Sequence, residues 1–501
     1  MKRLIYILVT LAFFGCDDFL EETSQNQIRP STVSDMEKIL EGEAYLTETE
    51  SEMFNYVTAF LTDEIKCSLY DENNVSIAGT FKNLKETWRR MFCYDVTMFD
   101  EGDEDEKAHT DYWSLPYERI KGCNIALDYV DDMQGDDDRK AYLKGEALAL
   151  RGFYSLHLVN LFSLPYTYGD PTKNPGVPLK LRSGVTEEKP SRGTVAGVYE
   201  QIEKDLSEGA RLMLANPQDL TLYRMNGTAA YGLLSRAYLY MGKWDKCIEY
   251  ADSVFKANKN LAYFPDYTGY GKVWSVRYCP DEILWACHYI TPSAANKKIF
   301  GWSYPSPWLP SDELVNLYGQ DIDPDQEEDI RATLTHQKSY LQKGTAYING
   351  VRQEWINGIF KAIDAYAGIR TGEVYLNRAE AYIRKYVENG DAVAGQKGLD
   401  DLNLLRSNRI RNYIEKQLND FASPQDLLEL CLRERRRELC WEGNFRWFDM
   451  RRTGMPRIEH EFFYQESDKS KYVLEENDPR YALPIPRVAL EKNSNLRQNQ
   501  Y

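Results

Sequence analysis

The sequence is poor in the motifs that most enzymes and nucleic-acid-binding proteins depend on. Its 501 residues include only 5 histidines, which form neither an HExxH nor an HxxEH pattern. It contains no GxSxG nucleophile turn and no phosphate-binding glycine loop. The net charge of -17 argues against a nucleic-acid partner, because phosphate binding requires a basic surface. We therefore expect a binding protein without catalytic activity or a nucleic-acid partner, although the many carboxylates leave a glycosidase as an alternative.

Cysteines are too sparse and too scattered for a disulfide scaffold. The chain has 9, and none lies in a CxxC pair. Metal binding through cysteine is therefore not expected. Apart from Cys16, we expect mostly buried free thiols, at Cys67, Cys93, Cys123, Cys247, Cys279, Cys287, Cys431 and Cys440.

Long apolar runs are absent except at the N-terminus. The run Leu4–Phe14 follows Lys2 and Arg3 and is too short for a stable membrane span, which is typical of an export signal. Cys16 comes directly after this run and indicates a lipoprotein signal, in which cleavage occurs before Cys16 and its thiol is acylated. We expect residues 1–15 to be this signal peptide.

A surface tether is expected over residues 16–35. Acidic residues immediately follow Cys16 in the sequence DDFLEE, which is typical of the surface-export signal of some Gram-negative outer-membrane lipoproteins. Phe13 and Phe14 stand where a leucine and a small residue are commoner in lipoprotein signals. A secreted form without lipid is therefore a second interpretation.

Helical periodicity dominates the rest of the chain. Ala141–Phe162 is apolar almost all round, which predicts a buried helix. Thr228–Ala257 and Thr371–Arg409 each contain two amphipathic helices joined by a glycine-containing corner, like a tetratricopeptide unit. A fourth pair is expected over Asp111–Met133. These patterns predict a mainly α, tetratricopeptide-like helical-repeat scaffold.

One insertion interrupts this pattern. Asn260–Asp325 is rich in Tyr, Trp, Pro and Gly, which predicts short strands and structured loops. We expect an N-terminal helical-repeat region over 36–260 and a C-terminal region over 261–501, packed as one body, with a loop-rich insertion at 261–325.

Two acidic stretches raise the question of a metal. Asp321–Asp329 has aspartates at its first, third and fifth positions, like the start of an EF-hand. Gln326 replaces the glycine of that loop, and Ala332 replaces its terminal glutamate. This stretch and Asp100–Lys107 are predicted to be solvated acidic loops. No cofactor is expected, and calcium is left open.

The most charged stretch is Leu432–Gly454, with seven arginines among four acids. Helical spacing places Arg435 and Glu442 on an apolar face, where each charge needs a partner, and the helix is expected to end near Gly443. An anion site and a catalytic cluster are alternatives. We favour an internal structural network made of Arg435, Glu438, Glu442, Arg446 and Asp449.

Several of these stretches together resemble the SusD/RagB family of outer-membrane nutrient-binding lipoproteins. Leu432–Gly454 and the tail Tyr481–Tyr501, with its Ile-Pro pair and Asn-Leu-x-Gln-Asn ending, resemble family hallmarks. Gly372–Tyr382, Trp113–Asn124 and the sequence DDFLEETSQ after Cys16 also match. The matching stretches extend over the whole chain after the signal peptide.

The resemblance implies a tetratricopeptide-like scaffold with irregular loops and short strands on its ligand-binding face. It also implies a lipid-anchored protein of the outer membrane that faces the cell surface. Such a protein captures oligosaccharide or polysaccharide and delivers it to a SusC-like TonB-dependent transporter. Two alternatives remain: a peptide- or protein-binding uptake lipoprotein on the same scaffold, and a tetratricopeptide adaptor with only protein partners.

The resemblance does not supply binding residues, so candidates come from side-chain chemistry. Sugars have apolar C–H faces, which stack on exposed aromatic rings, and hydroxyls, which bond amides and acids. Aromatic and amide side chains in loops or near polar segments are therefore the candidates, with core packing as the alternative for each ring. They are Tyr70, Asn83, Trp88, Trp274, Trp302, Tyr304 and Trp308, with Asn73 and Asn74 as further polar partners.

Overall fold

The computed structural model describes most of the chain between residues 30 and 501. The described residues are 30–47, 50, 57–67, 78–100, 111–184, 189–266, 279–289, 308–334, 344–348, 351–355, 365–366, 368–464 and 468–501. The predicted signal peptide, the lipidation site Cys16 and most of the predicted tether lie outside them. Within the described ranges, every helix is too short or too polar to cross a lipid bilayer.

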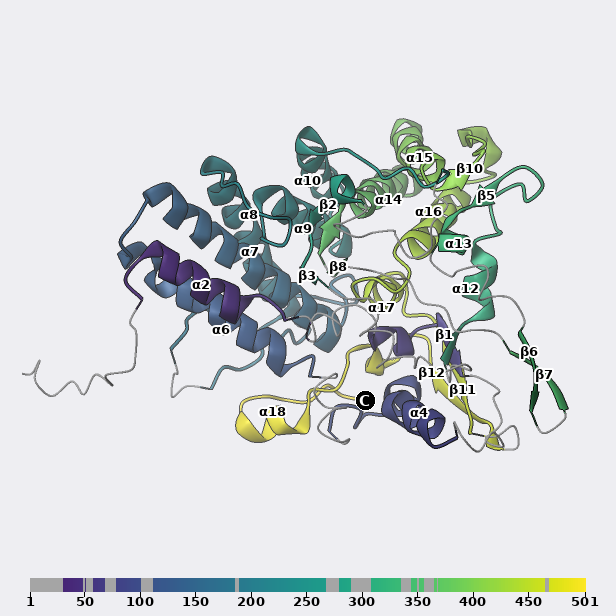
Figure 1. Cartoon of the computed structure of the whole chain (residues 1–501), viewed down its shortest axis with the longest axis horizontal. Helices are drawn as coiled ribbons and strands as arrows, with labels where there is room; N and C mark the ends of the chain where they lie inside the picture. Colours follow the sequence, from purple (N-terminus) through teal and green to yellow (C-terminus); the bar gives the residue numbers. More distant parts are fainter. Residues whose placement is uncertain are drawn as a thin grey trace, which may run out of the picture.

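Helices stacked side by side form one end of the molecule (Figure 1). They are α2 (Val33–Ala44), α6 (Ser114–Tyr129), α7 (Asp137–Phe162) and α8 (Val195–Ala215). Helix α7 is buried on nearly all sides from Tyr142 onward, as its apolar sequence predicts. The expected pair at 111–133 is wrong, because that stretch forms α6 and the short 3-10 helix η3 (Val130–Asp132). Its helical partners are α2 and α7 instead.

Two helix pairs continue the stack. The first is α9 (Gly227–Tyr240) with α10 (Trp244–Ala257), and the second is α14 (Thr371–Asn389) with α15 (Ala392–Ser407). Gly242 and Gly390 turn their corners, each with a φ of 69°, a conformation that glycine adopts without steric cost. The second pair lies against the first through α10 and α14. The predicted tetratricopeptide-like, mainly helical fold is confirmed.

Shorter helices and turns complete the body. Helix α4 (Ala78–Phe92) lies in the N-terminal half, and α12 (Asp312–Leu317) and α13 (Arg331–Leu334) lie between α10 and α14 in the sequence. Helices α16 (Pro424–Glu438), α17 (Phe445–Arg452) and α18 (Arg487–Lys492) end the chain. The remaining 3-10 turns are η2 (Val57–Leu61), η4 (Pro280–Glu282), η5 (Leu418–Asp420) and η7 (Pro479–Tyr481).

The described strands form small antiparallel pairs, most of which join distant parts of the chain. In sequence order the pairs are β1 (Ile65–Cys67) with β4 (Trp308–Pro310), β2 (Ile283–Trp285) with β9 (Ile369–Arg370), β3 (His288–Tyr289) with β8 (Ala365–Tyr366), β5 (Glu328–Asp329) with β10 (Ile410–Arg411), β6 (Gly344–Ile348) with β7 (Val351–Trp355), and β11 (Ile458–Phe462) with β12 (Ser470–Leu474).

One hydrophobic cluster extends from Val33 to Leu496 and so includes residues of both halves of the chain. A second cluster lies under α14, α15 and α16. The eight cysteines from Cys67 to Cys440 are free thiols, and all except the partly exposed Cys93 are buried. The prediction of mostly buried free thiols is therefore confirmed.

Two predicted ligand-stacking rings belong to this core. Trp88 and Trp308 are both 0% exposed. The Phe60 ring stacks on Trp88 with centroids 5.1 Å apart and meets the edge of Trp308 at the same distance. Phe92 adds a second contact to Trp308, at 4.8 Å. The ligand-stacking prediction is therefore wrong for these two rings, because their faces are covered by neighbouring aromatic side chains.

Removing the Trp308 ring should destabilise the fold. We expect Trp308→Ala to lower the free energy of unfolding by about 3–5 kcal/mol, because it leaves a cavity among Phe60, Phe92 and Phe462. Denaturant unfolding followed by circular dichroism measures this change. Tyr263→Ala, at a ring that is 54% exposed, is the control and should leave the midpoint unchanged. Equal midpoints for Trp308→Ala and the wild-type protein would contradict the core assignment.

Candidate functional site

The arginine-rich stretch begins inside helix α16. Ser423 and Asp426 form a capping box at its start, and Pro424 occupies the first turn. The helix ends already at Glu438, before the expected end near Gly443. Trp441, Gly443 and Asn444 then adopt positive φ angles, which turn the chain into α17. Glu442 therefore reaches its partner from a turn and not from the face of a helix.

Two glutamates at the end of α16 organise the buried charges. Glu438 accepts from the guanidiniums of Arg331 at 2.9 Å, Arg370 at 2.6 Å and Arg409 at 2.9 Å. Glu434, one turn earlier, contacts Arg331 at 2.6 Å and is bonded by further arginines. Burial alone raises the pKa of both carboxyls, but the surrounding guanidiniums outweigh it and hold both pKa values well below the ordinary range.

The other members of the predicted network also form ion pairs. Glu442 accepts from Arg370 at 3.1 Å. Arg435 donates to Asp449 at 2.7 Å rather than to Glu438 or Glu442. Arg446 donates to both carboxylate oxygens of Asp63, at 2.8 and 2.6 Å. Sequence spacing did not identify Asp63, Arg331, Arg370 and Arg409 as partners, because they lie far away along the chain.

A glycine makes room for this cluster. Gly372 lies in the first turn of α14, and a Cβ atom there would be 2.5 Å from Arg370 Nη1, 2.8 Å from Glu282 Oε1 and 3.0 Å from Glu438 Oε1. A larger residue at this position would push apart the charged groups of the network. The glycine of the Gly372–Tyr382 motif is therefore required by close approach.

The network also holds parts of the loop-rich insertion. Glu282 of η4 accepts from Arg370 at 2.7 Å and Arg409 at 2.9 Å. Glu313 of α12 accepts from Arg436 at 2.5 Å. Arg436 of α16 therefore acts together with Arg370 of β9 and Arg409, the residue before β10, to hold these two parts of the insertion on the helical body.

The acidic stretch at 321–329 contributes two carboxylates to the same network. Asp321 accepts from Arg433 at 2.9 Å and also bonds Arg437, while Asp329 accepts from Arg331 at 2.7 Å. The prediction of a solvated loop is thus wrong for these two aspartates. Among the described residues, no group of three or more His, Cys, Asp or Glu side chains is arranged to hold a metal ion.

Most arginines of the stretch are therefore already neutralised inside the protein. Arg452 donates to Glu380 at 2.7 Å, which leaves Arg451 as the exception. Arg451 is buried and bonds the Ser163 carbonyl just beyond the end of α7, and burial lowers its pKa to about 10. A helix C-terminus carries partial negative charge, which favours a guanidinium there. The geometry is that of a scaffold and leaves few guanidiniums for an external anion.

A buried carboxyl next to Asp63 has a different environment. Glu64 is 1% exposed, and its nearest charged partner is Arg436, whose Nε lies 3.9 Å from Oε1. Burial raises the pKa of Glu64 to about 7, whereas Arg446 and Arg436 hold the pKa of Asp63 at about 2 despite its burial. Two adjacent carboxyls therefore differ in protonation because only Asp63 has close ion pairs.

The remaining ligand candidates fall outside what the structure describes. Tyr70, Trp274, Trp302 and Tyr304 lie outside the described residues, and for Asn83 only the backbone within α4 is described. Strands β1 and β4, which border the Tyr70 and Tyr304 segments, pair with each other, with Cys67 opposite Trp308. These candidates stay predictions.

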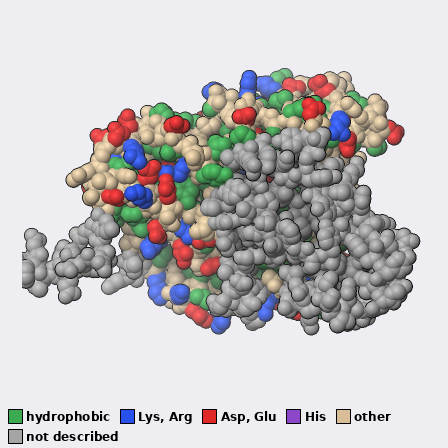
Figure 2. Space-filling model, in the orientation of Figure 1, with side chains coloured by type: hydrophobic (Ala, Val, Ile, Leu, Met, Phe, Trp, Pro, Cys, Tyr) green, Lys and Arg blue, Asp and Glu red, His purple; other side chains and the backbone are tan. Residues whose placement is uncertain are grey.

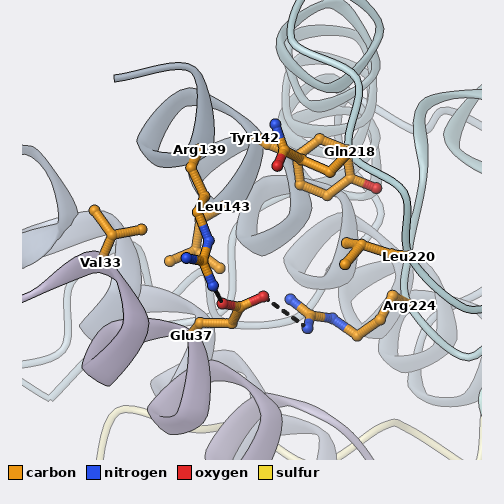
Figure 3. A pocket seen from close by; sticks show the side chains of 8 residues that line it. All are labelled: Val33, Glu37, Arg139, Tyr142, Leu143, Gln218, Leu220 and Arg224. Carbon is orange, nitrogen blue, oxygen red and sulfur yellow. Dashed lines mark hydrogen bonds and ion pairs between the residues drawn. The ribbon is translucent and has the colours of Figure 1, made fainter. Parts of the chain in front are cut away.

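A recess lies at the other end of the molecule, between α2, α7 and the segment that joins α8 to α9. Its volume is about 220 Å³. Figure 3 shows the Glu37 carboxylate between the side chains of Arg139 and Arg224. On the face shown in Figure 2, acidic and basic side chains are interspersed over this end of the molecule. Apolar and polar groups line the recess together: Val33, Tyr142, Leu143, Leu220, Glu37, Arg139, Gln218 and Arg224.

Two family models match most of the sequence. Residues 18–239 match a model described as "Starch-binding associating with outer membrane". Residues 323–501 match a model described as "SusD family". The two matches contain the predicted hallmarks, including Leu432–Gly454 and the C-terminal tail. No curated protein sequence matches the chain.

Solved structures share the fold. A SusD superfamily protein from Bacteroides thetaiotaomicron is 23% identical, with a TM-score of 0.67, and the match covers 94% of this chain and 100% of that one. A SusD-like carbohydrate binding protein from Bacteroides vulgatus is 21% identical, with a TM-score of 0.64 and coverage of 93% and 97%. A SusD superfamily protein from Parabacteroides distasonis is 19% identical, with a TM-score of 0.60 and coverage of 93% and 98%.

Neutralising Glu438 should strongly destabilise the protein. We expect Glu438→Gln to lower the free energy of unfolding by about 3–5 kcal/mol, because three buried guanidiniums lose their shared partner. The control is Glu459→Gln on β11, where an exposed glutamate pairs with Arg457 and Lys471. Thermal and denaturant unfolding of both variants measure the difference. A Glu438→Gln protein as stable as the control would contradict a structural role for the network.

Glu64 should make stability fall as pH rises. Its native pKa of about 7 lies above the ordinary 4.5, so its protonated form is favoured by folding. Its contribution is full below pH 4.5 and is lost as pH rises through 7, with a size of up to about 3 kcal/mol. Glu64→Gln should therefore gain stability relative to wild type between pH 5 and 8. Parallel curves of unfolding free energy against pH would refute this assignment.

Proposed function

The chain belongs to the SusD/RagB family, and from this premise we propose that it captures oligosaccharide or polysaccharide at the cell surface for a TonB-dependent transporter. The observation that carries the proposal is that the two family models match both ends of the chain, 18–239 and 323–501. The family is one of carbohydrate-binding proteins associated with the outer membrane. A SusC-like outer-membrane transporter is the partner that family membership implies.

The chemistry of the chain supports a neutral ligand. Its net charge is -17, and the arginine-rich stretch is largely neutralised by internal carboxylates. A long anionic ligand would therefore meet an unfavourable field. A neutral glycan instead requires flat aromatic faces and hydrogen-bonding groups, which the insertion at 261–325 supplies in quantity.

We place the glycan-binding face on the insertion and on the Tyr70 segment. Glu282, Glu313 and Asp321 are points at which the network holds this insertion, so its loops start from a rigid base. A rigid base lowers the entropy that a binding loop loses when it holds a ligand. With Trp88 and Trp308 in the core, the ring candidates are Tyr70, Trp274, Trp302 and Tyr304.

The anchor and the orientation follow from the N-terminal sequence. Acylation of Cys16 would hold the protein on the outer membrane, because several acyl chains on one residue bind a bilayer firmly. The acidic residues after Cys16 direct such proteins to the outer surface, where extracellular polysaccharide is available. The protein is then a binding component that performs no chemistry on the glycan.

Polysaccharide binding should depend on the aromatic residues of the insertion. We expect the chain starting after Cys16 to be retarded in native gels that contain one class of plant, mucin or fungal polysaccharide. Trp302→Ala should weaken binding in calorimetry by about ten-fold or more, since one lost stacking contact costs about 1.5 kcal/mol. Its melting temperature should stay at the wild-type value.

The matched control is Tyr129→Ala, at a ring at the end of α6 that is 51% exposed. This variant should bind like the wild-type protein. Binding of a peptide mixture with no binding of any polysaccharide would overturn the proposal in favour of peptide uptake. A Trp302→Ala variant that loses binding and stability together would instead assign Trp302 to the core.

A further inference from the structure

The recess between α2, α7 and the α8–α9 segment combines an apolar floor with a polar rim. Val33, Tyr142 and Leu143 are buried beneath it, and Leu220 contributes an apolar side chain that is 36% exposed. Glu37 of α2, Arg139 of α7 and Gln218 supply polar groups around it (Figure 3). Three separate elements thus converge on one small cavity at the helical end of the molecule.

The polar groups are held in place before any ligand arrives. Arg224 donates from Nε and Nη2 to the two oxygens of the buried Glu146, both at 2.6 Å, and from Nη1 to Glu37 at 3.2 Å. The Tyr45 hydroxyl donates to Glu146 and accepts from the Met225 backbone N–H at 2.8 Å. This chain of bonds fixes Glu37 from below, so ligand binding costs little side-chain entropy.

Several rim groups keep hydrogen-bonding capacity. Each Glu37 oxygen accepts from one arginine, and a carboxylate oxygen has a second lone pair for another donor. Among the described residues, Arg139 is bonded through Nη2 to Glu37, and no partner contacts its Nε or Nη1. Gln218 uses its Nε2 on the Asn216 carbonyl and keeps its amide oxygen. The rim therefore offers acceptors and donors side by side.

The charges argue against an anion. Two guanidiniums, Arg139 and Arg224, face three carboxylates, Glu37, Glu41 and Glu146, so the cluster carries a formal charge of -1. The volume of about 220 Å³ lies below the range of roughly 300–1,000 Å³ that takes drug-sized ligands. A small neutral molecule with adjacent hydroxyls on one side and C–H groups on the other fits these properties.

We propose that this recess is a second saccharide site that takes a single neutral pyranose unit. Two adjacent hydroxyls donate to the Glu37 carboxylate, and another accepts from Arg139. The C–H face of the ring lies on Leu143 and Leu220. This inference rests on the proposed function, and it adds a site for one sugar unit to the extended glycan site on the insertion.

The test uses the protein from residue 17 onward, with labelled Leu and Val methyl groups, and follows its methyl NMR spectrum during titration with methyl pyranosides. The probes are the methyl glycosides of glucose, galactose, mannose and N-acetylglucosamine. We expect one of them to shift the Leu220 methyl signals, which are identified by their loss in Leu220→Met. Arg139→Met should weaken this binding about ten-fold or more, because it removes a charged hydrogen-bond donor.

The matched control is Arg211→Met, which removes another exposed arginine with one glutamate partner, Glu208, on α8. It should leave the titration unchanged. If the wild type is retarded by polysaccharide but no glycoside shifts the Leu220 methyls, the recess proposal is overturned and the proposed function stands. A shift with methylammonium chloride alone would also overturn it, in favour of a cation site. If neither polysaccharide nor glycoside binds, both proposals fail together.

Discussion

The buried carboxylate of Glu438 is the interaction on which the rest of the structure depends. It joins the guanidiniums of Arg331 in α13, Arg370 in β9 and Arg409 just before β10, which are separated widely along the chain. An isolated buried charge costs several kcal/mol, so each arginine must find its carboxylate or the chain does not pack. Such a network contributes less to net stability than to the choice of one arrangement. It explains why so many arginines occur in a chain with a strongly acidic balance.

This constraint divides the molecule into a rigid frame and the segments attached to it. The helices from α7 to α15 pack around two apolar clusters, and α16 with α17 adds a network of ion pairs beside them. Glu282 and Glu313 connect the insertion to the same network of ion pairs, so in the proposed function the frame positions the binding loops without touching ligand. The arginine-rich stretch is thus scaffold, and we propose that the aromatic loops and the recess bind the ligand.

Local sequence patterns predicted the elements well and their long-range partners poorly. The two tetratricopeptide-like pairs followed from periodicity and from corner glycines such as Gly242, because both signals act within one helical turn. The position of Arg435 on an apolar helix face predicted that its charge would be paired. Its partner Asp449 lay within the same stretch, but Asp63, the partner of Arg446, was not predictable, since no local rule links residues so far apart.

The sequence patterns misplaced Trp308 and gave no indication of the recess. Trp308 lies in a Pro- and Ser-rich stretch that is typical of an exposed loop. It nevertheless forms part of β4, which pairs with β1, and its ring is buried in the core. Glu37, Arg139 and Arg224 carry no local signal of a site, because each is an ordinary charged residue on or next to a helix. Only the packing of α2 against α7, and of the α8–α9 segment against both, brings them together.

The central claim is that the arginine network holds a frame while the insertion binds glycan. Hydrogen exchange followed by mass spectrometry, with and without the bound polysaccharide, tests it most directly. We predict that peptides from 428–454 exchange slowly in the free protein and do not change on binding, while peptides from 261–325 become protected. Glycan-dependent protection inside 428–454, with none in 261–325, would contradict the account.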